Sequence, residues 1–135
     1  MSSFENFRRL TNFTQDEKIG LKEHCFARKV DVEGHFLYMG RDIPSYGQTT
    51  FDFRGTRYHF YRHQLALFLK KLEEPDFSFV TWDNPSMTTS HLCTKKRCIN
   101  PTHLELESAE MNNSRIGCFR AGQSFGHSQS PNCIL

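Results

Sequence analysis

The sequence predicts an α+β fold in which short antiparallel strands and a few helices form one small domain. Residues 49–62 alternate apolar and polar side chains around Gly55, which is the pattern of a β-hairpin. Residues 63–73 repeat apolar side chains at helical spacing. That apolar stripe consists of Leu65, Phe68, Leu69 and Leu72. A chain of 135 residues is expected to form a single domain, 1–135.

Composition excludes several classes of protein. Hydrophobic residues make up 37% of the chain, and no run of eighteen apolar residues is present, which argues against a membrane protein. The opening stretch MSSFENFRRL lacks the apolar segment of a secretory signal, which favours an intracellular location and leaves a nuclear one open. The net charge of +2 is too small to identify a partner. Five cysteines without a secretory signal favour metal ligation over a disulfide framework.

The first third of the chain predicts a helix followed by extended structure. Residues 1–24 read as one amphipathic helix and its approach, with Thr14 and Glu17 forming a capping box. Residues 25–40 alternate weakly and predict a strand. Residues 41–47 contain proline and glycine, which predict a loop.

The predicted hairpin has one apolar and one polar face. The apolar face carries Phe51, Phe53, Tyr58 and Phe60. The opposite face carries Asp52, Arg57, His59 and Tyr61. This polar face is either plain solvated surface or a surface that lies against a nucleic-acid groove. In the second case the expected contacts come from Arg41, Arg54, Arg57, His59 and Tyr61.

The segment after the hairpin predicts a helix and another strand. The apolar stripe of residues 63–73 is explained by packing in the core, and Pro75 ends the helix. The apolar run FSFVTW at residues 77–82 predicts a strand, and residues 83–89 predict a loop.

The densest chemical signal is a set of cysteine and histidine residues between 93 and 103. Cys93, Cys98 and His103 have the spacing C-x4-C-x4-H, which suits a tetrahedral Zn²⁺ ion. A structural zinc takes four ligands, and Cys25 is the best distant candidate for the fourth. The alternative is that these are ordinary buried cysteines.

A second set of potential ligands lies near the C-terminus. It consists of Cys118, His127 and Cys133, at looser spacing. These three residues could hold most of a second zinc ion, with a water or another residue as the fourth ligand. The alternative is a tail in which cysteine and histidine occur by chance.

Residues 90–116 predict two strands and a helix joined around the metal loop. His91 precedes Cys93 by two residues in a strand, so both side chains point to the same side. The run LELES predicts a second strand, and Ser108 then caps a short helix that ends at Gly117. The result is a ββα unit held together by metal.

The side chains around this unit suit the hydrolysis of a phosphodiester bond. His91 has the type of side chain that takes a proton from water near neutral pH. Asn112, on the helix, can face His91 and offer a neutral oxygen to Mg²⁺. Arg57 can contact a phosphate with two hydrogen bonds.

The block SHLC-x4-C-x-NP-x-HL-x-x-ES, residues 90–108, resembles the His-Me finger (ββα-metal) nucleases, and most closely the His-Cys box homing endonucleases. Asn112, Arg115 and Cys118 continue this resemblance. Upstream, His24-Cys25 is similar to the family's first zinc ligand. GTRYHFYR, residues 55–62, is similar to the strand that carries the family's catalytic arginine.

The resemblance implies a zinc-stabilised α+β domain with a ββα-metal catalytic unit that cuts double-stranded DNA and leaves 5′-phosphate and 3′-hydroxyl ends. It implies His91 as general base, Asn112 or else Asn113 as the Mg²⁺ ligand, and Arg57 at the scissile phosphate. The implied ligands of the first zinc are Cys25, Cys93, Cys98 and His103, and those of a second are Cys118, His127 and Cys133. The implied parts are a DNA-facing region 24–75, a catalytic unit 76–118 and a tail 119–135.

Two departures from the family leave points open. Phe125 stands where the second zinc site of the family has a cysteine. The C-terminal tail is shorter than the one through which the homing enzymes dimerise, so a homodimer stays undecided. The alternatives to a nuclease are a non-catalytic zinc-stabilised DNA-binding module and a zinc-stapled protein-interaction domain of the RING type.

Overall fold

The computed structural model describes residues 3–27, 29–38, 48–82, 84, 86–93, 95, 97–121 and 134. The helices are α1 (Ser3–Leu10), α2 (Gln15–Phe26), α3 (Arg62–Leu72), α4 (Phe79–Trp82), the 3₁₀ helix η1 (Pro101–His103) and α5 (Ala109–Ala121). The strands are β1 (Lys29–Val32), β2 (His35–Tyr38), β3 (Gln48–Phe53), β4 (Thr56–Tyr61), β5 (Met87–His91) and β6 (Leu104–Ser108). The predicted α+β class with antiparallel strands is confirmed, and the described strands form three separate two-stranded sheets.

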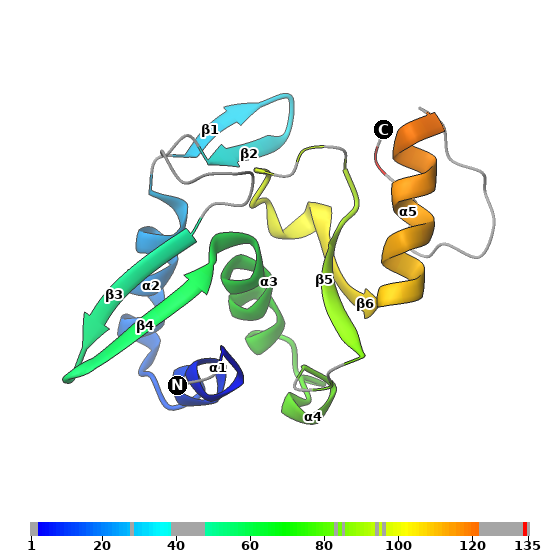
Figure 1. Cartoon of the computed structure of the whole chain (residues 1–135). Coiled ribbons are helices and arrows are strands. Elements are labelled where there is room, and N and C mark those ends of the chain that lie inside the picture. Colours follow the sequence, from blue (N-terminus) through cyan, green and yellow to red (C-terminus); the bar gives the residue numbers. More distant parts are fainter. Residues whose placement is uncertain are drawn as a thin grey trace.

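Helix α3 is the centre around which the hairpins are arranged. It lies between the β3–β4 hairpin and the β5–β6 pair, while α5 covers β5 and β6 from the other side (Figure 1). Helix α1 lies against β4, and α2 packs against α3. None of the helices in the described part of the chain combines the length and the apolar composition that a membrane span requires.

The N-terminal region forms two helices where the sequence predicted one. The predicted capping box is confirmed: Thr14 Oγ1 accepts from the Glu17 amide, and the Glu17 carboxylate accepts from the Thr14 amide. This cap starts a new helix, because Thr14 has extended backbone angles that α1 cannot continue through.

The single strand predicted at residues 25–40 is wrong, because this stretch contains the end of α2 and a complete hairpin, β1–β2. Glu33 and Gly34 form its turn, with φ of 50° and 84°. The predicted hairpin β3–β4 turns in the same way at Arg54 and Gly55, with φ of 50° and 77°. Two successive residues with positive φ are what a tight hairpin turn of type I′ requires.

The two faces of the β3–β4 hairpin are arranged as the sequence predicts. Tyr58 and Phe60 are buried, while Asp52, Arg57 and His59 are exposed on the opposite face. Under the apolar face, Phe7 from α1 packs at ring-centroid distances of 4.8 Å from Phe60, 4.7 Å from Phe68 and 5.2 Å from Trp82. Aromatic packing between α1, β4, α3 and α4 therefore builds the main core.

The strand predicted at residues 77–82 is wrong, since Phe79–Trp82 is the short helix α4. A short apolar run can form either structure, and tertiary packing decides between them. Here the Trp82 amide donates to the Ser78 carbonyl at 3.3 Å, and the buried Trp82 ring packs 4.9 Å from Phe68.

A buried ion pair fixes α5 on the β5–β6 pair. Ser108 caps α5 by accepting from the Met111 amide at 3.2 Å, as predicted, and the helix continues past Gly117 to Ala121. The fully buried Arg115 donates two hydrogen bonds to the Glu107 carboxylate, one of them from Nη2 to Oε2 at 2.9 Å.

Replacing Glu107 with Ala is expected to lower the free energy of unfolding by about 3–5 kcal/mol, because the Arg115 guanidinium then stays buried without its carboxylate partner. Urea denaturation measures this loss. The control is Glu105→Ala on the same strand, whose half-exposed carboxylate pairs with Lys71 and should cost about 1 kcal/mol or less. Replacing both partners, Glu107→Leu with Arg115→Met, should recover most of the loss. A loss below about 1 kcal/mol in the single variant would contradict the assignment.

Candidate metal centre and active site

Four potential metal ligands converge where the β1–β2 hairpin meets the loop before β6. They are His35, Cys93, Cys98 and His103, whose ligand atoms all lie within 4.8 Å of one another. Both cysteines are buried. No other group of three or more such side chains is found in the part of the chain that the structure describes. The structure thus brings together three of the predicted ligands, and it adds His35.

Backbone hydrogen bonds hold the β1–β2 hairpin against the metal loop. Leu37 forms an antiparallel bridge with Cys98, and the Ile99 amide donates to the Phe36 carbonyl at 2.8 Å. The Asn100 side chain donates to the Gly34 carbonyl at 2.8 Å, directly behind the turn that precedes His35. These bonds place His35 beside the cysteines, although it is far away in sequence.

The loop between the cysteines and His103 is shaped by its own turns. The Cys98 amide donates to the Lys95 carbonyl at 3.0 Å, which folds the loop back on itself. Asn100 Oδ1 accepts from the Thr102 amide at 3.0 Å and caps the 3₁₀ helix that begins at Pro101. Through this helix His103 turns back, with Nδ1 lying 3.6 Å from Cys98 Sγ.

The donor set fits a zinc ion. Two sulfurs and two imidazole nitrogens form a common tetrahedral zinc site, in which ligand atoms stand roughly 3.3–3.8 Å apart. Contact with the Cys93 thiol lowers the pKa of Cys98 well below its usual range, and the same contact raises the pKa of Cys93. The thiolate that a lowered pKa favours at Cys98 is the form of sulfur that zinc binds.

Cys25, predicted as the fourth ligand, lies elsewhere. It sits near the end of α2, fully buried in the core, and its thiol donates to the Arg62 carbonyl at 3.5 Å. Burial raises the pKa of Cys25 to about 12, which keeps the thiol protonated. His35 takes the position that the sequence analysis gave to Cys25. The signal for it was the Glu33-Gly34 turn, which marks a hairpin and puts the next residue at its start.

His91, the predicted general base, forms a hydrogen bond with the backbone of the metal loop. It is the last residue of β5 and is buried, and its Nε2 donates to the Cys98 carbonyl at 3.0 Å. This bond places the proton of the neutral ring on Nε2 and makes Nδ1 the basic atom. Burial lowers the pKa of His91, while the bond to the Cys98 carbonyl acts in the opposite direction. The His63 ring, which the sequence analysis did not single out, lies 4.9 Å from the His91 ring.

The other predicted catalytic residues lie on separate elements. Asn112 is half-buried in the second turn of α5, and its neighbour Asn113 is exposed. Arg57 lies on the exposed face of β4, where Nε donates to Asp52 Oδ1 at 3.0 Å, and its side chain is 74% exposed. The contacts in the described part of the chain bring His63, rather than Arg57, against His91.

The predicted DNA-contacting residues that the structure describes share the outer face of the β3–β4 hairpin. Arg57, His59 and Tyr61 alternate along β4 and are exposed, and Thr50 Oγ1 lies 2.8 Å from His59 Nδ1 across the pair of strands. Arg54, in the turn, pairs with Glu17 at 3.2 Å. Arg41 lies outside the described residues.

The predicted second zinc site is mostly outside the described residues. This holds for His127 and Cys133, and for Phe125 at the position where the family has a cysteine. Cys118 belongs to α5, but its side chain is not among those described. Near the C-terminus, the backbone of Ile134 forms a parallel β-bridge with Cys93, and the Ile134 amide donates to the Leu92 carbonyl at 2.6 Å. Residue 134 therefore lies beside the first metal centre.

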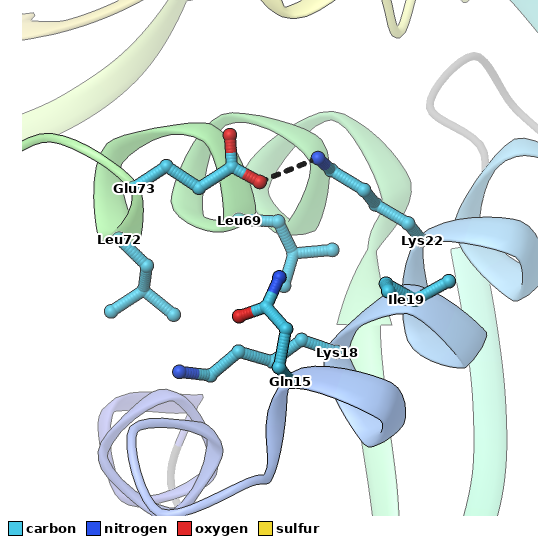
Figure 2. A pocket seen from close by; sticks show the side chains of 7 residues that line it. All are labelled: Gln15, Lys18, Ile19, Lys22, Leu69, Leu72 and Glu73. Atoms are coloured by element: carbon cyan, nitrogen blue, oxygen red, sulfur yellow. Dashed lines mark hydrogen bonds and ion pairs between the residues drawn. The ribbon is translucent and has the colours of Figure 1, made fainter.

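A shallow groove between α2 and α3 is separate from these residues. Figure 2 shows the residues that line it, among them the apolar Ile19, Leu69 and Leu72, and the ion pair between Lys22 and Glu73 at 2.7 Å. Its volume of ≈ 110 Å³ is well below the roughly 300–1,000 Å³ of small-molecule sites. Its lining shares no residue with the ββα unit that holds His91 and the metal cluster.

Replacing His35 with Ala is expected to remove about one equivalent of zinc, because one of the four clustered ligands is lost. Cys25→Ala, the matched control, should keep the wild-type zinc content, since the Cys25 thiol contacts the Arg62 carbonyl. Metal analysis after dialysis against a mild chelator distinguishes the two. Zinc loss in Cys25→Ala with full retention in His35→Ala would restore the ligand set predicted from sequence.

Removing zinc with a strong chelator is expected to unfold the domain. The ion would join the β1–β2 hairpin to the loop before β6, and structural zinc contributes about 10–16 kcal/mol of apparent binding free energy in small zinc domains. Circular dichroism during the titration should show loss of helix and strand signal, and added zinc should restore it. An unchanged spectrum after complete zinc removal would show that the fold does not depend on the metal.

A family model matches most of the chain. The family described as the zinc-binding loop region of homing endonuclease matches residues 38–134. No curated protein matches the chain. No solved structure matches it either.

The family match covers most of the chain and contains three of the four clustered ligands, Cys93, Cys98 and His103. His35 lies just before the matched region. The resemblance to homing endonucleases that the sequence indicates is thereby confirmed. The protein belongs to the family defined by the zinc-binding loop region of homing endonucleases.

Proposed function

We propose that this protein is a Mg²⁺-dependent endonuclease that hydrolyses double-stranded DNA with His91 as the general base. The observation that carries the proposal is the attachment of His91 Nε2 to the Cys98 carbonyl, at 3.0 Å, inside a ββα unit built around the metal cluster. A general base needs a fixed orientation as well as a suitable pKa. This bond holds one edge of the ring and directs the basic atom, Nδ1, to the opposite edge.

In the proposed reaction, water attacks the scissile phosphorus and passes a proton to His91 Nδ1. The bond from phosphorus to the 3′ oxygen breaks as the new bond from phosphorus to the water oxygen forms. The products carry a 5′-phosphate and a 3′-hydroxyl, whose oxygen takes a proton from solvent. A bound Mg²⁺ would stabilise the negative charge of the phosphate and of the leaving oxygen.

Asn112 is the proposed ligand of that magnesium ion. Its amide oxygen is a hard neutral donor, and Mg²⁺ characteristically takes few protein ligands and keeps the rest of its shell for phosphate and water. Asn112 is half-buried on α5, whose start is capped by Ser108 and whose next turn is held by the Arg115–Glu107 pair. A ligand on such a helix needs little reorganisation when the ion binds. The exposed Asn113 is the weaker candidate.

The outer face of the β3–β4 hairpin is the proposed DNA surface. It presents Arg57, His59 and Tyr61, with Arg54 in the adjacent turn as a further proposed contact. Arg41, which precedes β3 in the sequence, is proposed as another. Arg57 is proposed to leave Asp52 for the scissile phosphate. Both side chains of that ion pair are largely exposed, and water and salt screen such pairs strongly, so the exchange is easy.

Replacing His91 with Ala is expected to slow DNA cleavage by roughly 10²–10⁴-fold, the usual contribution of a general base. The assay follows conversion of supercoiled plasmid to nicked and linear DNA, with Mg²⁺ added or omitted and zinc retained throughout. Zinc content and the circular dichroism spectrum serve as controls, since His91 is not among the clustered ligands.

Each outcome of the plasmid assay has a defined meaning. Cleavage that requires Mg²⁺ and is lost in His91→Ala supports the proposal, and the ratio of nicked to linear product then distinguishes a monomer from a homodimer. Wild-type rates in His91→Ala would move the general base elsewhere. If a genome-sized DNA library is bound but never cut, the protein is a non-catalytic zinc-stabilised DNA-binding module.

A further inference from the structure

His63 is a buried histidine beside the proposed base, and the proposed reaction gives it no role. It is the second residue of α3 and is 6% exposed. Arg62, directly before it, anchors the start of the helix through its guanidinium group. That group donates to the carbonyls of Gln48 at 3.1 Å, His24 at 2.9 Å and Cys25 at 2.9 Å. The backbone at His63 is therefore held from two other elements, α2 and β3.

The His63 ring lies against the His91 ring. The centroids are 4.9 Å apart and the planes are inclined by 31°, which is close to a stacked arrangement. On its edge, His91 Nε2 donates to the Cys98 carbonyl. The hydrogen bond to Cys98 alone would still allow the His91 ring to tilt. The His63 ring, which lies against the face of His91, restricts that tilt. The metal loop and α3 thus restrain His91 from two directions.

His63 also lies next to the proposed DNA surface. The Tyr61 ring, 40% exposed at the end of β4, is 5.9 Å from the His63 ring. The three rings Tyr61, His63 and His91 form a continuous row from the outer face of the hairpin to the proposed base.

The chemistry of His63 suits a neighbour that gains a proton during catalysis. Burial, and in second place the nearby His91, lower the pKa of His63 to about 3, so its ring stays neutral at physiological pH. A neutral flat ring can cover an imidazolium ion without repelling it, and it offers a polarisable surface.

We propose that His63 is a positioning residue of the nuclease, whose ring fixes the plane of His91 for proton abstraction. The inference rests on the proposed function, because it assumes that His91 is the base. His63 is too buried to touch DNA itself, so its removal should affect the chemical step and leave DNA binding almost unchanged.

The test compares His63→Leu with His63→Phe, which both fill the space with apolar atoms but differ in whether a flat ring remains. His24→Leu is the matched control, since the His24 ring contacts Thr49 and Phe51 instead of His91. Single-turnover cleavage is measured at saturating protein with Mg²⁺, and DNA affinity is measured separately with Ca²⁺. We expect His63→Leu to cleave about tenfold more slowly with affinity within about twofold, because small misplacements of a catalytic group are costly. His63→Phe and His24→Leu should stay within about threefold of the wild type.

Equal rates in His63→Leu and His63→Phe would overturn the proposal, as would a loss confined to DNA affinity. A second readout does not depend on cleavage: the ¹⁵N chemical shifts of the His91 ring in the zinc-loaded protein without Mg²⁺. The wild type should show a single form protonated on Nε2. In His63→Leu a ring that is free to tilt should hold its bond to the Cys98 carbonyl less well, so both nitrogens should shift towards a mixture of the two neutral forms. If the wild type does not cut DNA, the proposed function fails, and identical ¹⁵N shifts in wild type and His63→Leu would then also overturn the positioning role.

Discussion

The sulfur of Cys98 belongs to the metal cluster, and the carbonyl of the same residue accepts the hydrogen bond from His91. Its backbone also forms the bridge to Leu37 that docks the β1–β2 hairpin. One residue thus couples metal binding, hairpin docking and the orientation of the proposed base. A change that moves the cluster by a fraction of an ångström would therefore be passed directly to the His91 ring. Through this coupling a small domain can hold the His91 ring in place without a large core behind it.

The architecture needs such a coupling because its sheets are small. An isolated two-stranded hairpin is marginally stable in water, and the described strands form three of them. Each hairpin gains its stability from a different source. The β3–β4 hairpin rests on the aromatic core around Phe7 and Phe68, and β5–β6 is held by α3 and by the Arg115–Glu107 pair. The outer strands β1 and β2 are tied to the cluster, so this hairpin depends most on the metal.

Features written in short stretches of sequence were predictable. The Thr14 capping box, the Arg54-Gly55 turn and the Cys93, Cys98 and His103 spacing each depend on a few neighbouring residues. Contacts that join distant segments were not. The Glu33-Gly34 turn marks a hairpin before His35, but whether His35 or Cys25 reaches the metal loop depends on how two distant segments pack. Residues 77–82 were misassigned because Trp82 packing, rather than local propensity, decides their structure. The sequence around His63 predicted only a helix with an apolar stripe. The contact between the His63 and His91 rings could not be predicted, because it depends on how α3 packs against β5.

The region that matches the family begins at residue 38, but the physical unit begins earlier. His35, the fourth clustered ligand, lies before that boundary. So do Phe7 and Cys25, which complete the core over α3, and the α2 carbonyls that anchor Arg62. A fragment limited to the matched residues would lose one metal ligand and would expose the aromatic rings of Phe60 and Phe68. The zinc-binding loop in this chain is therefore part of a larger folding unit, in which α2 and the η1 helix of the metal loop both pack against α3.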